Sequence, residues 1–212
     1  LSGNHTDHNH GCVVAASIDL DIIAVASARE DSVIRVKSEG FPEDVVDFAT
    51  YTAPVESEFG TSASIIAGMC AGFKDKGYAI GGFDAYCTSS VLRGSGLSSS
   101  AAVIISFLSA LCKVNGIQLS QQEIIDVAYD AELNYVGVSV GKLDQSCEVY
   151  SKKNHLLYLD TKDDSYELIP QHPDMKPYKI AIFFSGLERS LAGSAFNMRV
   201  DECRSAAYAL KA

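Results

Sequence analysis

A glycine- and serine-rich turn that opens an apolar helix constrains this sequence more than any other segment. Residues 82–92 read as a strand and run into Gly94 and Gly96, after which three serines begin a helix predicted over residues 98–114. Glycine lets the backbone approach a phosphate closely, and a helix start offers free N–H groups with a partial positive charge. The segment therefore predicts a strand, a phosphate-binding loop and a helix in succession.

The common phosphate-loop patterns do not describe this turn. The Walker A loop needs Gly-Lys-Ser/Thr, and the dinucleotide-binding pattern needs a third glycine where Ser99 stands. The serine hydroxyls at the helix start can donate hydrogen bonds or ligate Mg²⁺. The simpler alternative is a helix capped by serine after a glycine turn, with no ligand.

The segments before the turn predict strands and one helix. Apolar, β-branched or alternating runs at residues 12–18, 22–28 and 32–38 suggest a β-meander. Residues 41–54 hold two of the five prolines and read as an irregular connection. Residues 56–76 have helical periodicity, and Gly77 follows as a natural end.

The segments after the turn complete an α+β (mixed α/β) fold. Ser120 and Glu123 form a capping box that opens a helix reaching about Tyr135. Strands are predicted at residues 156–159 and 179–184, and a helix at residues 189–210. The prolines at 170, 173 and 177 mark a boundary between a first domain, residues 1–176, and the beginning of a second, residues 177–212.

Charge and cysteine usage exclude several functions. The formal net charge is −10 and no run of Lys or Arg stands out, so neither a nucleic acid nor an anionic membrane is expected as a partner. No apolar stretch has the length of a membrane span. The six cysteines are scattered without CxxC spacing, which favours free thiols and a cytoplasmic location.

A histidine-rich segment at the start of the chain permits two interpretations besides a plain polar turn. His5 and Asp7 are two residues apart, so in an extended segment they point to one side and can hydrogen-bond a common ligand. The other interpretation is a metal site of His5, Asp7, His8 and His10, of the kind found in metal-dependent hydrolases. That hydrolase pattern needs a further histidine where Gly3 stands.

The glycine-serine turn resembles the second signature of the GHMP kinases, the loop that wraps the phosphates of ATP. The resemblance implies that the last serine of the motif, Ser100, ligates Mg²⁺ together with Glu132, which stands twelve residues before Asp144. Glu132 alone would read as a solvated charge on a helix face. The implied ATP-binding residues are Gly94, Ser95, Gly96, Leu97, Ser98, Ser99, Ser100 and Ala101.

Two further segments resemble galactokinases within that superfamily. Residues 3–11 are similar to a signature with the core Gly-Glu-His-Thr-Asp-Tyr-Asn, and residues 141–145 to Gly-Ile-Met-Asp-Gln, whose Asp acts on the sugar 1-hydroxyl. The resemblance implies Asp144 as the catalytic residue, either as a base or as a positioning charge. It implies as sugar-binding residues Asn4, His5, Asp7, Gly141 and Phe196. Asn4 replaces a family glutamate and Phe196 a family tyrosine, which leaves the identity of the sugar open.

The resemblance implies a GHMP-kinase amino-terminal domain (ribosomal protein S5 domain 2-like) followed by the start of a second α+β domain. The implied reaction is ATP-dependent phosphorylation of a hexose, galactose foremost, at the anomeric hydroxyl, by a protein that is monomeric when complete. A family arginine would lie before Leu1 and a third signature after Ala212, so the 212 residues alone are expected to be inactive. The alternatives are a kinase for another galactose-like sugar, a sugar sensor without catalysis and a metal-dependent hydrolase.

Overall fold

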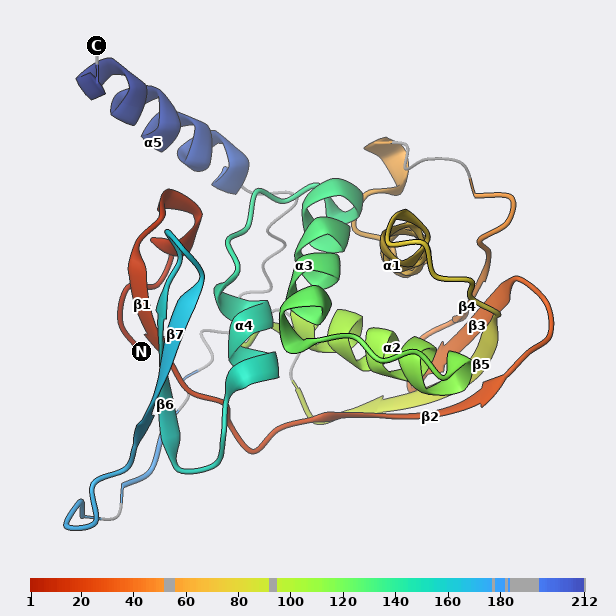
Figure 1. Cartoon of the computed structure of the whole chain (residues 1–212), viewed down its shortest axis with the longest axis horizontal. Helices are drawn as coiled ribbons and strands as arrows, with labels where there is room; N and C mark the ends of the chain where they lie inside the picture. Colours follow the sequence, from red (N-terminus) through yellow and green to blue (C-terminus); the bar gives the residue numbers. More distant parts are fainter. Residues whose placement is uncertain (52–55, 92–94, 177, 182, 184–194, 212) are drawn as a thin grey trace.

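The computed structural model describes residues 1–51, 56–91, 95–176, 178–181, 183 and 195–211 (Figure 1). Its described part has a mixed α+β architecture, as predicted, with a four-stranded sheet, a three-stranded sheet and helices between and beside them. No helix in the described ranges is both long enough and apolar enough to cross a membrane.

The four-stranded sheet has the order β2-β5-β3-β4. Its strands are β2 (Ile22–Ala28), β3 (Val33–Ser38), β4 (Glu43–Asp47) and β5 (Phe83–Ser89). The predicted meander is wrong, because β5 lies between β2 and β3, antiparallel to the first and parallel to the second. The predicted irregular connection over residues 41–54 is also wrong in part, since β4 pairs antiparallel with β3. Pairing across a long sequence separation leaves no local signal in the sequence.

The three-stranded sheet has the order β1-β6-β7 and joins segments from the beginning of the chain and from after α4. Its strands are β1 (Cys12–Ala15), β6 (His155–Asp160) and β7 (Ser165–Pro170). The strand expected over residues 12–18 stops at Ala15 and lies in this sheet, paired with β6. The strand expected at residues 156–159 is confirmed, while β7 was not predicted.

Helix α1 (Ser62–Asp75) begins later than predicted. Gly60 has φ +77°, which breaks any helical path from residue 56, and a short 3₁₀ turn covers Glu56–Glu58 instead. The Thr61 hydroxyl then caps the helix by accepting a hydrogen bond from the Ser64 N–H. The predicted end is confirmed, because Gly77 follows with φ +81°.

The remaining helices follow the glycine-serine turn in the chain. Helix α2 (Ser99–Asn115) and the capping box that opens α3 (Gln121–Ala131) are confirmed, and a π-helical turn, Glu132–Val136, continues α3. Helix α4 (Leu143–Tyr150) was not predicted. Helix α5 spans Phe196–Lys211, and residues 189–194 of the helix predicted there lie outside the described residues.

The strand predicted at residues 179–184 is not formed by its described part. Residues 179–181 and 183 have no regular structure, and residues 182 and 184 lie outside the described residues. The domain boundary at residue 177 stays a prediction, since Pro177 also lies outside them.

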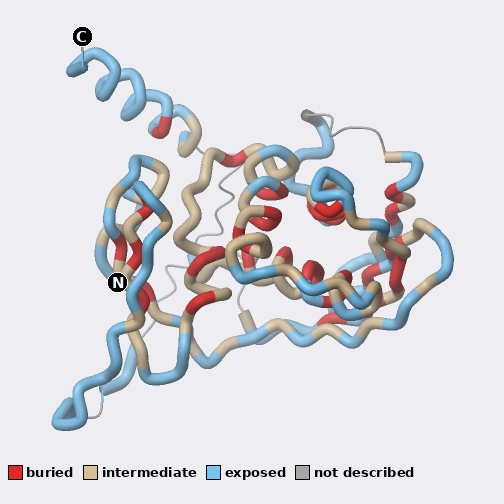
Figure 2. The backbone as a smooth tube through the Cα atoms, in the orientation of Figure 1, coloured by how far each residue is buried: buried red, intermediate tan, exposed pale blue. Residues whose placement is uncertain are grey.

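The core lies between the four-stranded sheet and helices α1, α2 and α3 (Figure 2). Fully buried side chains from both layers meet there, and each contributes about 1.5–3 kcal/mol of burial free energy; they include Ile34, Phe73, Phe83, Ile104 and Leu108. Gly68 on α1 permits close packing, since a Cβ there would lie 2.7 Å from the ring of Tyr135. This contact holds the π-helical turn, and with it Glu132, against α1.

Candidate functional site

The glycine-serine turn ends in a strained residue. Gly96 has φ +74° and Ser98 has φ +59°, so both adopt the left-handed conformation, which costs a non-glycine residue on the order of 1 kcal/mol. The Ser98 side chain makes no capping hydrogen bond to α2, so the prediction of a serine cap at that position is wrong. Its hydroxyl hydrogen-bonds the carboxyl group of Asp144 instead. Gly94 lies outside the described residues.

Helix α2 leaves backbone donors at its start. Its first intrahelical bond runs from the Ala102 N–H to the Ser98 carbonyl, at 3.1 Å. The N–H groups of Ser99, Ser100 and Ala101 therefore lack intrahelical acceptors, as in any first turn. Donors of this kind form an anion site when a ligand reaches them.

Glu132 is buried and hydrogen-bonded on both oxygens. The Ser100 hydroxyl donates to Oε1 and the Gln145 amide to Oε2, each at 2.6 Å. Only 5% of Glu132 is exposed, so its interpretation as a solvated helix-face charge is wrong. Burial chiefly raises the pKa of this carboxyl group, and the charge of Asp144 raises it further, while the two hydrogen bonds lower it.

Asp144 lies in the first turn of α4, where groups from three segments influence it. Burial chiefly raises its pKa, and the hydrogen bond from Ser98 opposes that shift. The charge of Asp7 raises the pKa and that of His5 lowers it, so both residues lie close by. The fold thus brings the glycine-serine turn, the histidine-rich segment and the Asp-Gln motif together around one carboxyl group.

Gly141 allows Asp7 to reach the start of α4. A Cβ at Gly141 would lie 2.1 Å from Asp7 Oδ2, a separation that no side chain can accept. Asp7 Oδ2 accepts a hydrogen bond from the Leu143 N–H at 3.3 Å. The requirement for glycine in the Gly-Lys-Leu-Asp-Gln motif is therefore steric, because the carboxyl group of Asp7 occupies the space.

The histidine-rich segment is not extended, as the sequence had suggested. A turn with His5 at φ +62° precedes a 3₁₀ helix, Asp7–Asn9, that ends at His10 with φ +59°. Hydrogen bonds among the polar groups of the segment itself favour this compact loop, for example from the Thr6 hydroxyl to the Gly3 carbonyl at 2.6 Å.

The metal site considered for this segment does not form. No group of three or more His, Cys, Asp or Glu side chains is arranged for a metal within the ranges that the structure describes. The ring of His10 instead faces the Thr161 carbonyl at 3.4 Å. His8 Nδ1 is buried without a hydrogen-bond partner among the described residues, and it lies 3.9 Å from Asp7 Oδ1. Burial chiefly lowers the pKa of His8.

Helix α5 closes the other side of the histidine-rich loop. The ring of Phe196 packs edge-on against His5 and His8, with centroid distances of 5.5 and 5.6 Å. Asn197 fixes this helix start, since its amide donates to the Gly137 carbonyl and accepts from the Ser139 N–H, each at 2.8 Å. Asn4 is exposed on the same loop.

Sequence reasoning assigned no role to Gln145 or Asn197. An amide side chain directly after a candidate catalytic Asp was the available signal for Gln145. The sequence offered no such signal for Asn197, because its hydrogen-bond partners lie about sixty residues away in the chain.

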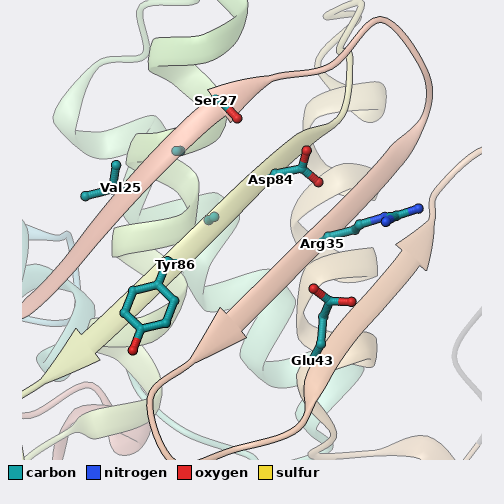
Figure 3. Close-up of a pocket in the computed structure, with 8 residues that line it drawn as sticks. Val25, Ser27, Arg35, Glu43, Asp84 and Tyr86 are labelled. Atoms are coloured by element: carbon teal, nitrogen blue, oxygen red, sulfur yellow. The ribbon is translucent and has the colours of Figure 1, made fainter.

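A shallow hollow lies away from these residues, on the face of the four-stranded sheet that the helices leave open. It has a volume of about 460 Å³ and contains none of the predicted site residues. Figure 3 shows Arg35, Glu43, Asp84 and Tyr86 standing out from that face. An open polar surface of this form does not enclose a ligand.

Comparisons with known proteins agree with this arrangement. The family model described as "GHMP kinases N terminal domain" matches residues 64–152, and the "Galactokinase galactose-binding signature" matches residues 1–28. A solved mevalonate kinase of Methanococcus jannaschii shares the fold, with a TM-score of 0.62 and 17% identity over 77% of this chain and 51% of the other. In its fold, its phosphate loop and the residues of the family model, the chain is thus similar to GHMP kinases.

Within that superfamily the chain is similar to galactokinases over nearly its whole length. It is 31% identical to a galactokinase of Roseiflexus over 100% of this chain and 52% of the relative, and 32% identical to one of Limosilactobacillus fermentum over 95% and 52%. The solved galactokinase of Lactococcus lactis, complexed with galactose, has a TM-score of 0.78 at 27% identity over 96% of this chain and 52% of the other. The chain thus spans about half the length of these relatives.

Proposed function

We propose that this chain supplies the sugar site and the phosphate loop of an ATP-dependent hexose 1-kinase whose substrate is galactose. The observation that carries the proposal is the pair of hydrogen bonds that joins Ser100 through Glu132 to Gln145, the residue directly after Asp144. It connects the start of α2, which can bind phosphate, with the helix that carries the buried carboxyl group of Asp144, which can act on a sugar hydroxyl. The similarity to galactokinases supports the same reaction.

The nucleotide end of the proposed site is the turn from Gly94 to Ala101. The free N–H groups at the start of α2 would bind phosphate oxygens of ATP. Ser100 Oγ and Glu132 Oε1 are 2.6 Å apart, which suits two neighbouring ligands of Mg²⁺. Mg²⁺ usually binds one or two protein oxygens and takes the rest from phosphates and water, so this pair fits it. When bound, the ion would neutralise charge that develops on the phosphates.

Asp144 would act at the sugar 1-hydroxyl. In the proposed reaction the anomeric oxygen attacks the γ-phosphorus, ADP leaves, and the hydroxyl proton passes to Asp144 or is held by it. A pKa raised by burial makes this carboxyl group a better proton acceptor than an exposed Asp. The Ser98 hydrogen bond would keep the carboxyl group oriented before the sugar binds.

The sugar would lie among Asn4, His5, Asp7, Gly141 and Phe196. These residues come from the loop before β1, the segment before α4 and the start of α5, and the loop contacts both of the others. The Lactococcus lactis relative was solved with galactose, which supports this sugar. Phe196 lacks the hydroxyl of the family tyrosine, so another galactose-like sugar is the second candidate.

Three wider features belong to the same proposal. We infer cytoplasmic location and a monomeric complete protein. We also infer a domain division near residue 177, with residues 1–176 forming the GHMP amino-terminal domain.

The decisive experiment measures ADP formation by the full-length protein with ATP, Mg²⁺ and a panel of hexoses. We expect turnover with galactose at about 1 per second or faster and release of the sugar 1-phosphate. Turnover with another hexose alone would replace galactose as the substrate. Sugar binding without any ADP formation would instead identify a sensor.

A further inference from the structure

One lysine connects three segments beside the proposed site. Lys142 directly precedes α4, and its ammonium group lies 3.1 Å from Asp126 Oδ1 on α3 and 2.6 Å from Asp164 Oδ2 between β6 and β7. It also lies over the ring of Tyr129, 5.7 Å from the centroid. The lysine side chain is only 24% exposed, so water screens these ion pairs less than pairs on the surface.

The turn that carries Asp164 also holds the loop of Asp7. The hydroxyl of Thr161, at the start of that turn, lies 3.0 Å from the Asp7 carbonyl and 2.8 Å from the Gly11 carbonyl. Asp164 itself has φ +58°, a conformation that Asp tolerates better than most residues. One short turn therefore contacts both the loop with Asp7 and the residue two positions before Asp144.

The start of α4 is also held from the other side by the hydrogen bond from Gln145 to Glu132, while its attachment toward the Asp7 loop is weaker. Lys142 provides no side-chain cap, and the Leu143 N–H reaches Asp7 Oδ2 only at a long 3.3 Å. The galactokinase pattern has isoleucine where this chain has Lys142. Isoleucine could hold the start of α4 by apolar contacts only, whereas Lys142 makes ion pairs with Asp126 and Asp164.

We propose that Lys142 is a positioning residue, which fixes the first turn of α4, and thereby the Asp144 carboxyl group, relative to the loop that carries Asp7. The expected effect on catalysis rests on the proposed kinase function, whereas the structural claim that Lys142 holds the first turn of α4 in place does not. Misplacing a reacting group by about 1 Å costs roughly 10²-fold in rate, so a modest shift of α4 is measurable.

The kinetic test compares Lys142→Met, Lys142→Arg and the control Lys152→Met in the full-length protein. Lys152 is exposed just after α4, and the structure gives it no ion pair within the described residues. We expect Lys142→Met to lower kcat by about tenfold or more with KM for ATP little changed, since no hydrogen bond or ion pair joins Lys142 to the described residues of the nucleotide loop. Lys142→Arg should restore most of kcat, and the control should behave as wild type.

Hydrogen exchange gives a readout that does not depend on activity. In Lys142→Met the amide of Ser146, bonded to the Lys142 carbonyl at 3.0 Å, should exchange at least about tenfold faster, while amides of α2 keep their protection. Should this variant not fold, Asp164→Asn, which retains the Asp126 pair, takes its place. Unchanged kcat and unchanged exchange in α4 would overturn the inference. If wild type phosphorylates no hexose, the proposed function fails, and the exchange result still decides whether Lys142 fixes α4.

Discussion

The Ser100 hydroxyl donates a 2.6 Å hydrogen bond to Oε1 of Glu132, although the two residues stand 32 positions apart in the chain. The bond joins the first turn of α2 to the π-helical turn after α3. Gln145 extends it to α4, the helix of Asp144. A π-helical turn inside a longer helix often accompanies a functional site, and here it bears the buried carboxyl group.

Replacing Asp144 by Asn should abolish phosphoryl transfer and leave ATP affinity within a few-fold of wild type. The carboxylate is proposed to act at the sugar hydroxyl and not at the nucleotide, so kcat should fall by about 10² or more. Steady-state kinetics and nucleotide titration of the full-length protein measure both effects. Asp201→Asn, an exposed change on α5, is the control. Near-normal turnover by Asp144→Asn would remove this residue from the mechanism.

Replacing Ser100 by Ala should weaken use of Mg²⁺·ATP and also reduce stability. The variant leaves Oε1 of buried Glu132 without its donor, a loss of about 1.5–3 kcal/mol if the carboxyl group is charged. Ser98 does not offset this loss, because it makes no capping bond to α2.

Ser109→Ala provides the matched control for that experiment, since it removes an exposed hydroxyl from the same helix, ten residues after Ser99. Denaturant unfolding and the Mg²⁺ dependence of kcat separate the two effects of Ser100→Ala. Loss of stability with unchanged Mg²⁺ and ATP dependence would leave Ser100 as a structural residue only.

The double change Asn4→Glu and Phe196→Tyr should shift sugar preference toward galactose if the natural substrate differs from it. The Phe196→Tyr change would add a hydroxyl to a ring that contacts His5 at a centroid distance of 5.5 Å, and a site that hydrogen-bonds a sugar hydroxyl discriminates strongly. The measurement is the ratio of kcat/KM values for galactose and the competing hexose, for each single variant and for both together. If wild type already prefers galactose and no variant changes the ratio, these positions do not set specificity.

Cys70 should resist alkylation at pH 8, whereas the exposed thiols of Cys12 and Cys203 react. Burial raises the pKa of Cys70 to about 12, so almost no thiolate forms at pH 8. Because the folded pKa lies above the usual value of 9.0, the folded state binds the extra proton between these values, and stability should fall as pH rises from about 9 to 12. Mass spectrometry after a timed iodoacetamide pulse tests the reactivity. Modification of Cys70 as fast as that of Cys12 would contradict its burial.

The sequence by itself determined the local features of this protein. Gly77 ended α1, Ser120 and Glu123 capped α3, and Gly116 followed α2, because each signal acts within one helical turn. The order of the three motifs also indicated the family and named the residues that the fold then brings together.

Only the tertiary structure decided how distant segments pair and which charges are buried. No local pattern places β5 between β2 and β3, or makes β1 the partner of β6, because strand pairing is decided by packing between segments far apart in the chain. The same holds for Glu132, which reads as a surface charge until α1, α2 and α4 pack around it. Ser98 likewise makes no capping bond to α2, and its hydroxyl instead lowers the burial-raised pKa of Asp144, 46 positions later, which no local pattern indicates.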